Sequence, residues 1–202
     1  MQMQIKVLIL LAAVAIILPV TSGFLFWRKP SKPIDPEQVE KTIGVKYIID
    51  DIPIDSTDKR PDIKRKVKYI VIHNTANPTS NAKGERSYLT NKYNQTSTSY
   101  NIVLDENEIV EVIPLNEKSH HSATEEGNMY GIGIELCESG DFEKTKENAA
   151  KLTAYLMHYY KIPKKRVKTH HDFSGKYCPR LMLETWDEFI EQVMHEYNSM
   201  KI

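Results

Sequence analysis

Two histidines and one cysteine are the side chains of this sequence best suited to chemistry. His73 closes an apolar run, and His170 and Cys178 lie eight residues apart near the end of the chain. Two imidazoles and one thiolate can form a catalytic zinc site, which takes three protein ligands and leaves the fourth tetrahedral position for water. Lys176, two residues before the thiolate, can place a positive charge beside whatever the metal polarises. The set predicts a zinc-dependent hydrolytic site.

The segments around these side chains indicate how they could meet. Residues 67–72 form a short apolar run rich in β-branched residues, which predicts a central strand that ends at His73. Residues 167–169 predict another short strand, which leads into His170. Gly175 follows and allows the next loop to turn back toward this histidine. The loop could therefore put both of its ligands on one ion.

The remaining pattern predicts a sheet with helices packed against it. We expect strands at residues 45–49, 100–104, 109–113 and 131–137, the second and third joined as a hairpin by residues 105–108. We expect helices at residues 83–93, 143–160 and 186–197, with Thr185 and Glu188 forming a capping box before the last one. The predicted fold class is therefore a single α/β domain with a mixed central β-sheet flanked by helices.

The start of the chain predicts an N-terminal transmembrane helix. Residues 7–27 form a charge-free run of 21 residues, which is long enough to cross a bilayer as a helix. Trp27 beside Arg28 is typical of an interfacial anchor. We expect an uncleaved anchor with the catalytic domain on the extracellular side. A secretory signal cut near residues 21–23, which would release a secreted protein, is the alternative.

Composition sets the domain boundaries and excludes one class of partner. Residues 28–43 contain three prolines among charged residues, which predicts a semi-extended linker. Residues 44–202 are then expected to form the catalytic domain. Lys plus Arg and Asp plus Glu both number 27, so the formal net charge is zero. Because no basic field covers the chain as a whole, nucleic acid is not an expected partner.

The two cysteines could form a disulfide in an exported protein, so this alternative has to be weighed against metal binding. Cys137 ends a predicted buried strand, where a free cysteine packs as a small apolar residue. Cys178 follows Lys176 by two residues and His170 by eight, which suits a metal ligand better. We therefore expect Zn²⁺ at Cys178 rather than a disulfide.

Four segments, in order along the chain, carry a family resemblance. They read YIVIHNTA at 69–76, SYNIV at 99–103, GIGIE at 131–135, and H-x-D at 170–172 followed by K-x-C-P at 176–179. In this they resemble the zinc N-acetylmuramoyl-L-alanine amidases, a family that includes phage endolysins, bacterial autolysins and animal peptidoglycan-recognition proteins. The resemblance covers roughly residues 45–195. It implies that His73, His170 and Cys178 bind zinc.

The resemblance also implies the substrate and the catalytic residues. The expected reaction is hydrolysis of the amide between N-acetylmuramic acid and L-alanine of the peptidoglycan stem peptide. Glu135 maps to the family's acidic strand residue and is the expected general base. Lys176 and Tyr100 map to positions expected to stabilise the oxyanion. Side chains alternate along residues 131–137, so Glu135 can point away from the core that the isoleucines fill.

Two positions depart from the family pattern. Asn74 stands where many members have a second histidine, and residues 120–123, His-His-Ser-Ala, stand where many have Trp-His-x-Gly. Asn74 and His121 are candidates for substrate binding. His121 could equally support the metal site from behind its ligands. The departure at 120–123 affects the expected shape of one groove wall and leaves the metal ligands unchanged.

Alternative functions are compatible with parts of this pattern. A non-catalytic module that binds peptidoglycan fragments is the main one, because some peptidoglycan-recognition proteins have lost zinc; Cys178 argues against it. A structural zinc site would need a fourth protein ligand, which the motifs do not supply. Another zinc peptidase or amidase is a further alternative. The expected partners are peptidoglycan and, through the N-terminal segment, the membrane, with the protein as a monomer.

Overall fold

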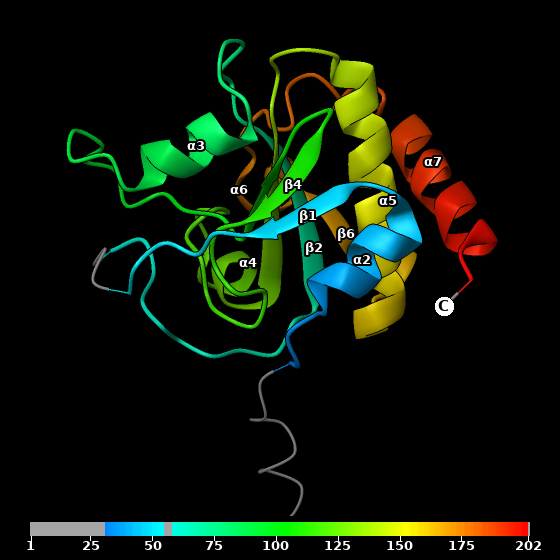
Figure 1. Ribbon diagram of the computed structural model, residues 1–202, viewed down its shortest axis with the longest axis horizontal. Coiled ribbons are helices and arrows are strands. Elements are labelled where there is room, and N and C mark those ends of the chain that lie inside the picture. The colour runs from blue at the N-terminus through cyan, green and yellow to red at the C-terminus, as the bar shows by residue number, and fades with distance from the viewer. Residues whose placement is uncertain (1–30, 55–57, 202) are drawn as a thin grey trace, which may run out of the picture.

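Six strands form one sheet at the centre of the computed structural model, which describes residues 31–54 and 58–201 (Figure 1). The strands are β1 (Lys46–Ile49), β2 (Tyr69–Asn74), β3 (Ile102–Leu104), β4 (Glu108–Glu111), β5 (Gly131–Leu136) and β6 (Val167–Thr169). Their order across the sheet is β1-β4-β3-β5-β2-β6. Neighbouring strands are parallel except for the β3–β4 hairpin, which is antiparallel. This confirms the predicted mixed sheet and the predicted hairpin.

Helices cover both faces of this sheet, so the fold is one α/β domain (Figure 1). The helices are α2 (Pro36–Ile43), α3 (Ala82–Leu89), α4 (Glu125–Tyr130), α5 (Phe142–Tyr160), α6 (His170–Ser174) and α7 (Trp186–Ser199), with a short 3₁₀ turn η1 (Lys164–Arg166). Helices α2, α5 and α7 pack together on one face, and α3 and α4 lie on the other. The helix predicted at residues 83–93 forms but ends earlier than expected, at Leu89.

The strands separate two apolar layers. Ile132, Ile134 and Leu136 of β5 are fully buried in the larger layer, beneath α5 and α7. A smaller layer beneath α3 contains Cys137. Because side chains alternate along a strand, Glu135 points to the opposite face from the isoleucines, as predicted. The functional side chains of β5 therefore lie on the face that α3 and α4 cover.

The linker prediction for residues 28–43 is wrong over the part that the structure describes. Pro36 begins helix α2, Asp35 caps it by accepting a hydrogen bond from the backbone N–H of Glu37, and Gly44 ends it in the left-handed conformation. Proline is favoured at the first position of a helix, where no intrahelical N–H bond is lost. Val39 is fully buried in the larger core layer. The folded domain therefore begins before residue 44, and α2 belongs to it.

Two other local predictions concern the capping box at Thr185 and the two cysteines, and their outcomes differ. The capping box predicted at Thr185 is wrong, because the Thr185 side chain makes no cap hydrogen bond. A capping box forms instead at the start of α6, between Thr169 and Asp172. Cys137 and Cys178 are both free thiols, which agrees with the preference for a metal ligand over a disulfide.

The predicted membrane anchor, residues 7–27, lies outside the described residues. Within residues 31–54 and 58–201, no helix combines the length and the apolar character needed to cross a bilayer.

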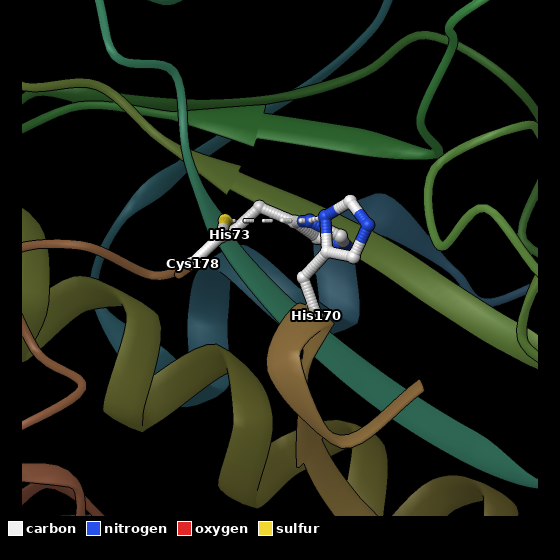
Figure 2. A group of neighbouring side chains, drawn as sticks. All are labelled: His73, His170 and Cys178. Carbon is white, nitrogen blue, oxygen red and sulfur yellow. Dashed lines mark hydrogen bonds between the residues drawn. The ribbon is translucent and has the colours of Figure 1, made fainter. Parts of the chain in front are cut away.

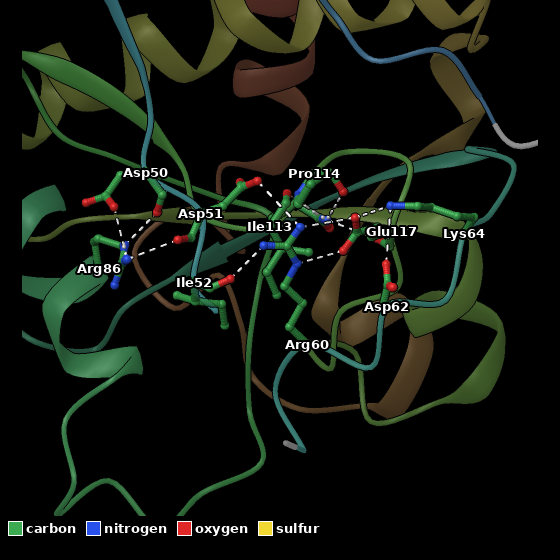
Figure 3. Close-up of polar contacts among 11 residues, drawn as sticks. Asp50, Asp51, Ile52, Arg60, Asp62, Lys64, Arg86, Ile113, Pro114 and Glu117 are labelled. Carbon is green, nitrogen blue, oxygen red and sulfur yellow. Dashed lines mark hydrogen bonds and ion pairs between the residues drawn. The ribbon is translucent and has the colours of Figure 1, made fainter. Parts of the chain in front are cut away.

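A buried ion-pair network fixes the loop that follows β4 (Figure 3). The Glu117 carboxylate is 1% exposed and accepts a hydrogen bond from Arg60 Nε at 2.8 Å. Lys64 binds the same carboxylate, and a second Arg60 nitrogen donates to the carbonyl oxygen of Ile52 at 2.6 Å. A buried carboxylate needs such partners to offset the loss of water. The network holds the segment that leads, four residues later, to His121.

Candidate active site

The three predicted metal ligands converge, although they lie up to 105 residues apart in sequence (Figure 2). The Nδ1 atoms of His73 and His170 are 3.2 Å apart, and Cys178 Sγ is 3.8 Å from His73 Nδ1. The three donor atoms all lie within 4.8 Å of one another, and the three residues are buried. Within the described ranges this is the only group of three or more such side chains placed to hold one ion.

The sheet and one short helix create this convergence. Strands β2 and β6 are parallel neighbours with Ile72 paired to Thr169. The next residues, His73 within β2 and His170 at the start of α6, therefore lie side by side. The capping box begins α6 at His170, and Gly175, with φ of 74°, ends the helix. The backbone N–H of His171 then donates to the carbonyl oxygen of Cys178 at 3.1 Å, which closes the loop.

The donor set fits zinc. Zn–N bonds of about 2.0–2.1 Å and a Zn–S bond of about 2.3 Å place tetrahedral donors roughly 3.4 Å (N to N) and 3.6 Å (N to S) apart. The observed separations of 3.2 and 3.8 Å are close to these values. Burial lowers the pKa of His73 well below its usual value and that of His170 to about 4. Both imidazoles are therefore neutral at neutral pH, which is the form that binds metal.

Cys178, unlike the two histidines, binds metal in its charged form, because the thiolate and not the thiol is the ligand. Burial raises the pKa of this thiol to about 11, against the effect of a hydrogen bond from the backbone N–H of Asn74 and the charge of Lys176. A bound cation deprotonates a coordinating thiol. Metal binding by this site should therefore release a proton from Cys178.

His121 lies behind His73 and fixes its tautomer. His121 is 4% exposed; its Nδ1 is 3.0 Å from His73 Nε2, and its Nε2 is 3.1 Å from the carbonyl oxygen of Gly131. A carbonyl only accepts, so His121 Nε2 carries the proton and its Nδ1 accepts from the Nε2–H of His73. The lone pair of His73 therefore lies on Nδ1, the atom that faces the other two ligands. Of the two predicted roles for His121, its contacts favour support of the metal site over substrate binding.

We expect His121→Ala to weaken zinc affinity by about 10–100-fold, as loss of a partner of a metal-binding histidine typically does. His121→Asn keeps a side-chain oxygen where His73 needs an acceptor, so it should recover part of the affinity, whereas His121→Phe should not. Competition with a chromophoric chelator measures the affinity, and thermal unfolding of the metal-free variants controls for folding. Equal zinc affinity in the wild type and His121→Ala would exclude the assigned role.

Arg65 lies beside this site, although no motif in the sequence indicates it. It is 3% exposed and donates to the same Gly131 carbonyl oxygen as His121, and also to Leu115 and to Asn101 Oδ1 at 2.9 Å. Burial lowers its pKa to about 9. Residues 59–68 contain several lysines and arginines, which are usually exposed to solvent, so composition could not indicate that Arg65 is buried.

Glu135 lies beside the ligands with part of its carboxylate unengaged. It is paired in register with His73 across β2 and β5, and its buried Oε2 has no hydrogen-bond partner in the described residues. Burial raises its pKa to about 8, and the charge of Glu85 acts in the same direction while Lys176 opposes both. A carboxylate with a raised pKa and a free oxygen is suited to accepting and returning a proton near neutral pH.

Lys176 lies at the rim of the site. Its exposed side chain lines a surface cavity of about 440 Å³ together with His170. The other lining residues are Ser97, Thr98, His120, His121, Ala123, Asn128 and Ser174. The charge of Lys176 lowers the pKa values of both histidine ligands after the larger effect of burial, which places the ammonium group within electrostatic reach of the metal site. A substrate in this cavity would contact both Lys176 and His170.

Asn74 and Tyr100 are placed differently from their predicted roles. Asn74 is buried, and its Oδ1 accepts a hydrogen bond from the backbone N–H of Leu181 at 3.1 Å, so it braces the loop that carries Cys178. The Tyr100 hydroxyl is buried and donates to the carbonyl oxygen of Glu85 at 3.0 Å. Its single proton is thus engaged by the backbone of α3. The contacts of both residues support structural roles beside the site.

Comparisons with known proteins agree with this geometry. Residues 63–181 match the family described as N-acetylmuramoyl-L-alanine amidase. The N-acetylmuramoyl-L-alanine amidase XlyA of Bacillus subtilis (strain 168) is 40% identical over 151 residues, which are 72% of this chain and 50% of that protein. The amidase CwlH of the same strain is 38% identical over 149 residues, 71% of this chain and 59% of that protein. The chain thus spans between half and three fifths of the length of these curated relatives.

Solved structures show the same relationship. The catalytic domain of XlyA aligns with a TM-score of 0.70 and 39% identity, covering 74% of this chain and 99% of that domain. The structure of PlyL aligns with a TM-score of 0.65 and 32% identity, covering 74% of this chain and 96% of the other. Because the family match extends over more than half of the sequence, this chain belongs to the N-acetylmuramoyl-L-alanine amidase family.

Proposed function

We propose that this protein is a zinc-dependent peptidoglycan hydrolase that cleaves the amide between N-acetylmuramic acid and L-alanine of the stem peptide. The observation that carries the proposal is the convergence of His73, His170 and Cys178 beside Glu135 in a chain of this family. The names of the relatives, all N-acetylmuramoyl-L-alanine amidases, support the choice of bond. A module that only binds peptidoglycan would have no need for a buried carboxylate beside three metal donors.

Zinc would be held by the two Nδ1 atoms and Sγ, and when bound it supplies a Lewis acid that lowers the pKa of water and polarises a carbonyl group. Glu135 takes the proton from the attacking water through its free Oε2 and returns it to the leaving amine of L-alanine. Lys176 stabilises the negative charge that develops on the carbonyl oxygen. His121 keeps His73 in the tautomer that directs Nδ1 to the metal.

Digestion of purified peptidoglycan by the full chain tests this proposal. We expect mass spectrometry to show intact stem peptides with a new L-alanine amino terminus, and glycan strands that retain the lactyl carboxylate. A chelator should abolish cleavage, and added zinc should restore it. The Cys178→Ser protein should be inactive and lose tightly bound zinc, whereas Cys137→Ser, which changes the other free thiol, should retain both. Binding of peptidoglycan without cleavage would establish the non-catalytic alternative.

We further propose that residues 7–27 anchor the protein in the membrane, with the domain on the extracellular side and acting as a monomer. The charge-free run of 21 residues supports the anchor. The peptidoglycan substrate supports the extracellular orientation. All the proposed ligands and catalytic residues come from one chain, which supports a monomer. Cleavage near residues 21–23, detected as a new N-terminus in the culture medium, would show a secreted enzyme instead.

A further inference from the structure

Positive charge gathers on one face of this electrically neutral protein. We define the basic face as Lys66, Lys68, Lys161, Lys164, Lys165 and Arg166. Four of the six, Lys66, Lys68, Lys161 and Arg166, line one cavity of about 550 Å³, and the other two adjoin it in η1. Tyr69 and Tyr160 also line this cavity, so it combines basic groups with aromatic rings.

Four lysines of this face have no carboxylate partner. Within the described residues, Lys66, Lys161, Lys164 and Lys165 form no ion pair with a carboxylate. On α5, by contrast, Lys144 and Lys151 share Glu147. The carboxylate of Glu126 reaches the basic face, where it accepts a hydrogen bond from the Tyr69 hydroxyl at 2.7 Å. The face therefore keeps a net positive charge that attracts an anionic surface.

The chain enters the fold at this face. The backbone N–H of Ser31 donates to the carbonyl oxygen of Arg65 at 2.9 Å, and the backbone N–H of Val67 donates to the Ser31 hydroxyl at 3.0 Å. The Tyr160 hydroxyl donates to the carbonyl oxygen of Lys32 at 2.9 Å. Figure 1 shows this entry point beside the end of α5. Anything attached before residue 31 must therefore leave the domain at the basic face.

The distance to the apolar run is short. Three residues, 28–30, separate Trp27 from Ser31, so the Cα atoms of Trp27 and Ser31 can lie at most about 14 Å apart. Electrostatic attraction to charged headgroups falls off over a Debye length of about 8 Å at physiological ionic strength. If residues 7–27 span the bilayer, the basic face can lie within about one Debye length of the lipid headgroups. Arg28, Lys29 and Lys32 add positive charge to the same short stretch.

We propose that the basic face docks the domain on anionic lipid headgroups. The identity of the partner rests on the proposed membrane anchor, whereas the amidase activity is independent of it. Tyr69 lies at the basic face and His73 lies four residues further along β2, about 13 Å away along the strand. Docking would therefore turn the metal site away from the lipid and toward the cell wall.

Lysine protection in vesicles tests the proposal with the full chain. The protein is reconstituted into phosphatidylcholine vesicles with and without phosphatidylglycerol and labelled with a water-soluble amine reagent. Mass spectrometry then gives the labelling rate of each lysine. At low salt, phosphatidylglycerol should slow labelling of Lys161 about fivefold or more, with no change at Lys92, an exposed lysine outside the basic face. High salt should restore the Lys161 rate while the chain stays on the vesicles.

Matched variants separate the basic face from total charge. The triple variant K66Q/K164Q/K165Q removes three charges from the basic face. Each lost charge should lower the equilibrium constant for docking about fivefold, so the protection of Lys161 should disappear. The control K41Q/K92Q/K201Q removes three charges elsewhere, also from lysines without a carboxylate partner, and should keep Lys161 protected. Thermal unfolding checks that both variants fold, and peptidoglycan digestion by the same variants in detergent should match the wild type.

Several results would overturn the docking proposal. One is equal labelling of Lys161 in neutral and anionic vesicles, and another is equal loss of protection in both triple variants. Protection that requires purified anionic wall polymer rather than anionic lipid would assign the face to a different partner. Release of the chain from vesicles by salt would refute the anchor on which the partner rests. Failure to digest peptidoglycan with Lys161 still protected would refute the amidase function alone.

Discussion

Replacement of Glu135 by glutamine is expected to lower turnover by about 10²–10⁴-fold while the protein keeps its zinc and its fold. Glutamine has nearly the shape of glutamate and cannot take a proton from water. Glu135 does not belong to the donor set, so its loss should leave metal content unchanged. The measurements are kcat on peptidoglycan fragments and zinc per protein. Near-normal turnover in this variant would remove Glu135 from the mechanism.

The stability of the same variant provides a control with a defined sign. Burial raises the pKa of folded Glu135 to about 8, so the folded state binds this proton more tightly than the unfolded state does. The resulting stabilisation is complete below the ordinary glutamate pKa and is lost as pH rises toward about 8. Metal-free Glu135→Gln should lack this loss and should melt above the metal-free wild type at pH values above 8. An inactive variant that is also more stable cannot owe its inactivity to misfolding.

The substitution Lys176→Ala is expected to lower kcat by about 10²–10³-fold, the usual effect of removing one group that stabilises an oxyanion. The effect on kcat should exceed that on KM, because this interaction strengthens only as charge develops on the substrate. Lys176→Arg should recover part of the rate by keeping the charge. Lys92→Ala, which removes an exposed charge outside the site, is the matched control. Turnover at the wild-type level in Lys176→Ala would leave zinc as the sole electrophile.

Combining the two substitutions tests whether they act on one transition state. If Glu135 and Lys176 serve the same step, the double variant should lose less activity than the product of the two single losses. Both side chains act on the same small region, since the charge of Lys176 lowers the pKa of Glu135 against the larger effect of burial. A fully multiplicative loss would show that the residues act in separate steps.

The convergence of His73, His170 and Cys178 could be predicted because its signals are local. His73 lies near the end of one short apolar strand and His170 directly follows another, and parallel strands that end at one edge of a sheet bring such positions together. The loop from His170 to Cys178 is short enough, with Gly175 in it, to return to the same point. The hairpin and the alternation of β5 were predictable for the same reason, since each depends on a few consecutive residues.

The contacts of His121, Asn74 and Tyr100 could not be predicted, because they join segments that are distant in the sequence. His121 meets His73 and Gly131 only after the sheet has formed, and Tyr100 finds its acceptor in α3. No periodic pattern in the sequence indicates either contact. Arg65 is the clearest example of a contact that the sequence does not indicate. It donates to the backbone carbonyl oxygens of Gly131 and Leu115, and every residue has such a group.

The composition of residues 28–43 indicates a linker, whereas the local capping signals indicate helix α2. Three prolines among charged residues are typical of a linker, yet Pro36 occupies the first turn, where proline is compatible with a helix. Val39 and Ile43 then bury one face of the helix against the core. At Thr185 the sequence has the spacing of a capping box, but the Thr185 side chain makes no cap hydrogen bond.

Because Ser31 is already hydrogen-bonded to the domain and the proposed anchor ends at Trp27, almost no tether lies between them, and this limits how far the enzyme can reach. A domain of about 170 residues has a radius of gyration of roughly 16 Å. With its point of attachment at one end of β2 and its metal site at the other, the domain could act only on amide bonds that come within about one domain diameter of the bilayer. Such a geometry would confine cutting to the innermost strands of the wall and spare the outer layers.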